Sequence, residues 1–124
     1  MKLIKLQTRI KADILIVFDL ARSIDLHKIS TSHTNEQAIA GRTSGLIEID
    51  ETVTWRARHF GIYQTLTSKI TQFERPNIFV DEMVSGAFKS FRHEHIFETD
   101  GTETLMTDVF KFEAPGGFFG KAIG

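Results

Sequence analysis

Residues 52–112 read TVTWRARHFGIYQTLTSKITQFERPNIFVDEMVSGAFKSFRHEHIFETDGTETLMTDVFKF, and this stretch decides the fold. Apolar and polar side chains alternate along five segments of about nine to twelve residues, the pattern of strands with one buried and one solvated face. Turn-forming residues such as Gly61, Pro76 and Gly101 separate the segments. The five predicted strands are Thr52–Phe60, Gln64–Phe73, Asn77–Ser85, Phe88–Glu98 and Glu103–Phe112. Because their connections are short, they predict an antiparallel meander.

The residues before this meander predict one more strand and several short helices. Lys2–Ile10 alternates in the same way as the meander segments and predicts a strand. Asp13 is a suitable N-cap for an amphipathic helix that ends near Ser23. The remaining predicted elements are helical pieces at Asp25–Ser30 and Thr34–Ala40, and a short strand or lead-in at Leu46–Asp50.

Together these elements predict the α+β class, with helices at the ends of a curved antiparallel sheet of six or seven strands. The chain has 124 residues, the size of one domain, so residues 1–124 are interpreted as a single domain. A long curved sheet can wrap around a helix, and a loose wrap leaves a cavity between them.

The composition excludes several functional classes. The net charge is −1, so no electrostatic field indicates a nucleic-acid partner. No apolar run approaches the roughly 20 residues that span a bilayer, and the N-terminus has no signal-peptide pattern. The absence of cysteine removes thiolate nucleophiles and cysteine metal ligands, and it fits a reducing compartment. We therefore expect a cytoplasmic protein.

Strand alternation assigns an inner face to the predicted sheet, although both faces of the third strand are mixed. The apolar candidates for a pocket wall on this face are Trp55, Phe79, Phe91, Phe97, Met106 and Phe110. The polar candidates are His59, Asp81, His93, His95 and Asp108. Burying unpaired polar groups costs a few kcal/mol each. These side chains are therefore expected either to pair with one another or to line a cavity that holds water or a ligand.

The inner histidines allow two chemical interpretations. His93 and His95 form a His-x-His on a strand, which suits a metal ion with His59 or Asp108 as a third ligand. His59 with Asp108 or Asp81 would make an acid–base pair, but no cysteine or elbow serine accompanies it as a nucleophile. The interpretation we prefer is hydrogen bonding within a partly polar interior. No metal and no cofactor is therefore predicted.

Several motifs along the whole chain resemble one known superfamily. They are Ala21–His27, Gly45–Ile47, Thr52–Gly61, Phe79–Val84, Phe91–Phe97 and Met106–Asp108. Through them the chain is similar to the START/birch-pollen-allergen superfamily, also called the SRPBCC or polyketide cyclase/dehydrase-like group, and most of all to small bacterial members of it.

The resemblance implies a helix-grip fold, in which a strongly curved antiparallel sheet grips a long C-terminal helix over an apolar cavity. Members of the superfamily bind lipids, sterols, polyketides, quinones or plant hormones, and a minority catalyse cyclisation or dehydration. The chain stops at Gly124, where the gripping helix would begin. We therefore expect that helix to be truncated or supplied by another chain, and a homodimer is one such arrangement.

Three functions follow as hypotheses. The leading one is binding of an apolar or amphipathic small molecule between sheet and helices, with the inner histidines and aspartates orienting its polar group. The second is a cyclase- or dehydratase-type enzyme that uses His59 or His93 with Asp108 as acid–base groups. The third is a protein-interaction module whose sheet docks on a partner.

Overall fold

The computed structural model describes residues 2–31, 35–59, 61–86 and 88–114 of the chain. Within them lie seven strands and two helices. The strands are β1 (Lys2–Ile10), β2 (Gln37–Gly41), β3 (Thr52–His59), β4 (Ile62–Glu74), β5 (Ile78–Gly86), β6 (Ser90–Asp100) and β7 (Glu103–Glu113). The helices are α1 (Ile14–Ala21) and α2 (Ile24–Ser30). No helix in this part of the chain is long and apolar enough to cross a membrane.

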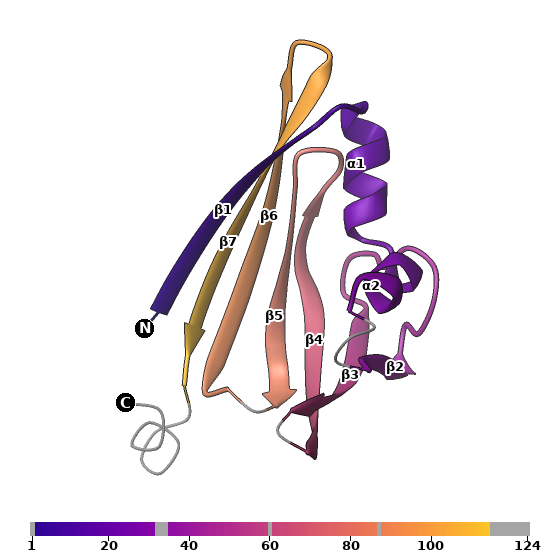
Figure 1. Cartoon of the computed structure of the whole chain (residues 1–124), viewed down its shortest axis with the longest axis vertical. Coiled ribbons are helices and arrows are strands. Elements are labelled where there is room, and N and C mark those ends of the chain that lie inside the picture. Colours follow the sequence, from indigo (N-terminus) through magenta and orange to yellow (C-terminus); the bar gives the residue numbers. More distant parts are fainter. Residues whose placement is uncertain (1, 32–34, 60, 87, 115–124) are drawn as a thin grey trace.

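All seven strands form one antiparallel sheet in the order β1-β7-β6-β5-β4-β3-β2. The predicted meander from β3 to β7 is confirmed, with strand ends that differ by a few residues. The predicted strand Lys2–Ile10 is also confirmed, and it pairs with β7 at one edge of the sheet. Figure 1 shows the strands side by side, with α1 and α2 on one side of the sheet. The α+β class is therefore confirmed.

The prediction of a helix at Thr34–Ala40 is wrong. Thr34 lies outside the described residues, and Gln37–Gly41 forms β2, which pairs with β3. The short segment is extended because hydrogen bonds to β3 satisfy its backbone, and Asn35, at φ 52°, does not continue a helix. The predicted C-terminal helix falls outside the described residues.

The segment Leu46–Asp50 leads into β3 rather than forming a strand. Leu46 makes an isolated bridge with Ser23, and Asp50 adopts a positive φ of 65° shortly before the strand. Of the two alternatives that the sequence leaves open, the lead-in is the one observed.

Both helices begin at side-chain caps. The Asp13 carboxylate accepts a hydrogen bond from the Leu15 N–H, as the sequence predicts. The first helix ends at Ala21, earlier than Ser23, because Ser23 is itself the N-cap of α2 and accepts from the Leu26 N–H. The separate helical piece predicted at Asp25–Ser30 is confirmed as α2, which lies beside β2.

The core lies where α1 meets the inner face of the sheet. Phe18 is fully buried, and its ring meets those of Phe73, Phe79 and Phe97 edge-on, with centroids 5.4, 5.3 and 5.1 Å away. Such edge-to-face packing is favourable beyond simple area burial. This aromatic cluster fixes α1 over β4, β5 and β6.

A buried arginine joins the end of α1 to the sheet and to the lead-in before β3. Arg22 donates from Nε to the Asp19 carboxylate at 2.9 Å and from Nη1 to the Ile47 carbonyl at 3.1 Å. Asp19 also accepts from Arg75 at 2.6 Å. The hydrogen bond from Arg75 and that from Arg22 lower the pKa of Asp19 to about 2, against a smaller opposing effect of burial. The contacts hold Ala21 and Ile47 beside the space between helices and sheet.

Candidate functional site

Two neighbouring cavities lie between the helices and the inner face of the sheet. The first cavity has a volume of about 350 Å³, and its wall includes Ile24, Ile47, Trp55, Phe79, His93 and Phe110. The second cavity, of about 340 Å³, is lined by residues that include Val17, Leu20, Met106 and Asp108. His95 lines both cavities, so it lies where they meet.

Four titratable side chains meet on the inner face of three adjacent strands. We call Asp81, His93, His95 and Asp108 the His–Asp cluster. Asp81 of β5 lies opposite His93 of β6, and His95 of β6 lies opposite Asp108 of β7. Because His93 and His95 are two residues apart on one strand, their rings share a face. The backbone register therefore brings all four side chains together.

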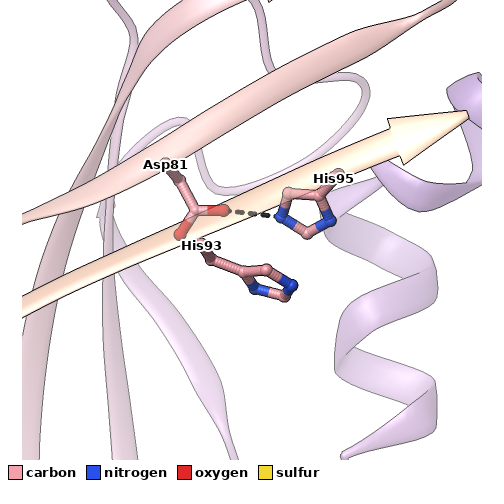
Figure 2. A group of neighbouring side chains, drawn as sticks. All are labelled: Asp81, His93 and His95. Carbon is pink, nitrogen blue, oxygen red and sulfur yellow. Dashed lines mark hydrogen bonds and ion pairs between the residues drawn. The ribbon is translucent and has the colours of Figure 1, made fainter. Parts of the chain in front are cut away.

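Hydrogen bonds in the His–Asp cluster run diagonally across the strands. His95 Nε2 and the Asp81 carboxylate are 2.8 Å apart, the interaction that Figure 2 draws. His93 Nε2 and Asp108 Oδ1 are 2.9 Å apart, and the same oxygen lies 3.3 Å from His95 Nδ1. Asp108 thus contacts both imidazoles, and His95 lies between two carboxylates.

This geometry favours the charged form of His95. Both of its ring nitrogens face carboxylate oxygens, and only an imidazolium can donate to both. Burial by itself lowers the pKa of His95, but the bonds to Asp108 and Asp81 outweigh burial and raise it to about 8. Burial likewise raises the pKa of Asp108, whereas its bonds to His93 and His95 together hold it well below its usual range.

Aromatic rings hold the imidazoles in place. The His95 ring stacks on Phe79 at 4.0 Å and on His93 at 3.7 Å, so the three rings form a column. Phe110 meets His93 edge-on, with centroids 5.3 Å apart. The packing limits rotation of both imidazoles and excludes water from the stacked faces.

One nitrogen of the cluster is available to a ligand. His93 Nε2 is hydrogen-bonded to Asp108, whereas His93 Nδ1 has no hydrogen-bond partner among the described residues. In that part of the chain, no buried side-chain nitrogen or oxygen lacks a partner. His93 Nδ1 is therefore reached by solvent, and His93 lines the first cavity. A polar group of a bound molecule could meet it there.

The structure places most of the predicted pocket residues around the two cavities. The first is lined by Trp55, Phe79, Asp81, Phe91, His93, His95 and Phe110, and the second by His95, Met106 and Asp108. Phe97 lies in the core against Phe18 and lines neither of these cavities. His59 belongs to β3, but its side chain lies outside the described residues, as does its predicted pairing with Asp81 or Asp108. The alternative predicted pair, His93 with Asp108, is hydrogen-bonded, and His95 pairs with Asp81.

The first cavity has a second polar pair that the sequence does not predict. His27 Nε2 of α2 lies 2.9 Å from the Glu36 carboxylate, and the His27 ring lies over Trp55 with centroids 4.3 Å apart. The sequence pattern placed Glu36 in a helix, and nothing in that local pattern brings it to His27. Their proximity depends on the pairing of β2 with β3.

Comparisons with known proteins relate the chain to solved structures only. No protein-family model matches it, and no curated protein matches it significantly. The protein TTHA0849 from Thermus thermophilus superposes with a TM-score of 0.71 at 16% identity, over 98% of this chain and 81% of that one. The ginseng major latex-like protein 151 from Panax ginseng gives 0.68 at 19% identity, over 91% and 79%.

A third neighbour, the protein DR_A0006 from Deinococcus radiodurans, gives a TM-score of 0.67 at 10% identity, over 90% of this chain and 83% of that one. At such identities the likeness concerns fold alone. The chain therefore shares the fold of these solved structures, and its antiparallel sheet with helices on one side agrees with the helix-grip fold that the sequence resemblance implies.

Proposed function

We propose that the first cavity binds a small amphipathic molecule whose polar group meets the His–Asp cluster. The observation that carries this proposal is a largely apolar wall, built from residues such as Trp55, Ile24 and Phe110, that also includes His93, whose Nδ1 is reached by solvent. Mostly apolar cavities with a few convergent polar groups are the usual form of a small-molecule site. The volume of about 350 Å³ is within the range of such sites.

The fold supports the same proposal, because the superfamily that the chain resembles includes carriers of lipids, polyketides and quinones. The charge of the His–Asp cluster also supports the proposal. Two carboxylates and a protonated His95 inside an apolar wall are costly to assemble, and bonding to a ligand is one reason to maintain them. The cluster would then orient the ligand while the rings bury its apolar part.

The single tryptophan of the chain provides the test. Trp55 lies in the wall of the first cavity, so its emission should report occupancy. We expect 8-anilinonaphthalene-1-sulfonate, an aromatic anion, to change that emission saturably at one site. Ser68→Leu places extra methyl groups in the cavity, because Ser68 is buried and lines it. This variant should weaken binding by about tenfold or more, equivalent to at least about 1.4 kcal/mol.

Thr65→Leu is the matched control for this experiment. Thr65 lies on the same strand as Ser68, but it is exposed and points to the other face. Binding should be unchanged in this variant. Equal weakening in both variants, or a signal that never saturates, would mean that the probe binds an apolar surface and not the first cavity.

A second candidate function is acid–base catalysis. The observation that favours it is the Asp108–His93 pair, in which the Asp108 carboxylate is bonded to His93 Nε2, Nδ1 has no partner among the described residues, and His93 lines the first cavity. A base so oriented typically contributes about 10²- to 10⁴-fold to proton transfer. Deuterium wash-in next to the carbonyl of a small diketone should then be accelerated by the protein and lost in His93→Gln, but kept in Glu98→Gln, which alters an exposed residue outside both cavities. Exchange at the buffer rate would rule against this candidate.

Other expectations from the sequence remain proposals. They are the cytoplasmic location, the organisation of residues 1–124 as one domain, and association into a homodimer. Leu3 and Leu6 on the edge strand β1 are 60% and 61% exposed, and such exposed apolar side chains would suit contact with a second chain.

A further inference from the structure

Three side chains of the His–Asp cluster lie close enough to share one ion. Asp81, His93 and His95 each offer a ligand atom, and these atoms all lie within 4.8 Å of one another. They come from two paired strands, so the backbone fixes their separation (Figure 2). Two imidazole nitrogens and one carboxylate oxygen are a donor set that suits divalent transition metals, zinc among them.

Asp108 is placed to orient the two histidines without binding the ion itself. A histidine that binds a metal through one nitrogen usually donates its other N–H to a carboxylate, which orients the ring. Asp108 Oδ1 lies 3.3 Å from His95 Nδ1, while His95 Nε2 faces Asp81. The same oxygen lies 2.9 Å from His93 Nε2. One carboxylate therefore orients both rings and leaves one nitrogen of each to bind an ion.

The charges also balance. Asp81 and Asp108 carry two negative charges into a site that is shielded by Phe79 and Phe110. A divalent cation bound to two neutral imidazoles would neutralise both carboxylates. Buried charges are tolerated when they are paired with opposite charges or coordinate a metal ion.

We propose that Asp81, His93 and His95 bind one divalent transition-metal ion, with zinc as the natural candidate, and that Asp108 orients the two histidines. Ligand nitrogens about 2.0–2.1 Å from a tetrahedral zinc lie about 3.3 Å apart. The donor atoms, which lie within 4.8 Å of one another, must therefore approach by up to about 1.5 Å relative to the hydrogen-bonded arrangement. The remaining coordination position would face the first cavity, which His93 lines.

The test is a calorimetric titration of chelator-treated protein with Zn²⁺, with no organic ligand present. We expect one equivalent per chain. Asp108→Asn should weaken Zn²⁺ binding by about 10- to 100-fold, the usual cost of removing a group that orients metal ligands. His93→Gln and Asp81→Asn remove ligands directly and should weaken it further. His27→Gln, which alters a histidine outside the cluster, should change nothing.

Two results would overturn the proposal. One is the absence of saturable one-to-one binding to the wild-type protein, and the other is binding of undiminished strength in His93→Gln and Asp81→Asn. Imidazole ¹⁵N resonances give an answer that needs no variant, because the ring nitrogens of His93 and His95 should both shift on addition of Zn²⁺. A failure here leaves the proposed binding of an amphipathic molecule untouched, since that test uses Trp55 and a metal-free probe.

Discussion

Replacement of Phe18 by alanine is expected to lower the free energy of unfolding by about 3–5 kcal/mol, the range for a large aromatic removed from a core. The Phe18 side chain has no exposed surface. It contacts the rings of Phe73, Phe79 and Phe97 from three different strands, so no single neighbour can move in to fill the space. Because domains of this size are stable by only about 5–15 kcal/mol, the variant should be close to unfolding.

Urea unfolding followed by circular dichroism measures this change. Ile16→Ala is the control, because Ile16 lies on the same helix and gains similarly in helix propensity, but 55% of the residue is exposed. It should change stability by less than about 1 kcal/mol. If the two substitutions had similar effects, Phe18 would not be the contact that fixes α1 over the sheet.

The strands were predictable because both of their signals are local. Period-two alternation marks each strand, and turn residues such as Gly61 and Gly101, which have positive φ, mark where the chain reverses. Val53, Trp55 and Ala57 are all buried, as alternation along β3 predicts. The third meander strand stayed ambiguous for a physical reason. Phe79 and Val80 are adjacent and both buried, so β5 is covered on both faces there and its burial does not alternate.

The candidate site was predictable in composition but not in pairing. Alternation places His93 and His95 on one face without any knowledge of their neighbours. Which carboxylate meets which imidazole depends on the register of β5 and β7 against β6, and on diagonal contacts that a shift of one residue would remove. The sequence therefore left His59 and His93 as alternative partners of Asp108, whereas the structure shows His93 bonded to Asp108 and His95 bonded to Asp81.

Segments outside the meander were harder to predict because their conformation depends on distant contacts. Gln37–Gly41 contains alanines that suit a helix. The segment is nevertheless extended, because it forms hydrogen bonds with the free edge of β3. The same pairing brings Glu36 to His27. Local propensity contains no information about an edge that is formed by residues beyond position 50.

The wild-type protein is expected to lose stability as the pH rises from about 6.5 to 9. The pKa of His95 is raised to about 8 in the folded state from an ordinary value of 6.5. A group whose pKa is raised by folding stabilises the protein fully below its unfolded pKa, and the contribution is lost as the pH rises through the folded pKa. The difference corresponds to about 2 kcal/mol. Urea unfolding of chelator-treated protein at pH 6, 7.5 and 9 measures it.

Asp108→Asn should remove most of this pH dependence. The amide can still accept a hydrogen bond, but it lacks the negative charge that favours the imidazolium, so the pKa of His95 should fall and the variant should be less stable at pH 6. At pH 9 the wild type has already lost the interaction, so the gap between the two proteins should narrow. The C–H resonances of the His95 ring give the pKa directly.

Glu98→Gln is the control, because it removes an exposed carboxylate from β6, the strand of His95. It should leave the dependence of stability on pH unchanged. An equal slope in wild type and Asp108→Asn would mean that Asp81 alone holds the proton on His95. A decrease in stability as the pH falls from 9 to 6.5 would mean that burial prevails and that His95 is neutral in the folded protein. A histidine that two carboxylates keep charged requires a wild type that is most stable near pH 6 and an Asp108→Asn variant whose stability hardly changes with pH.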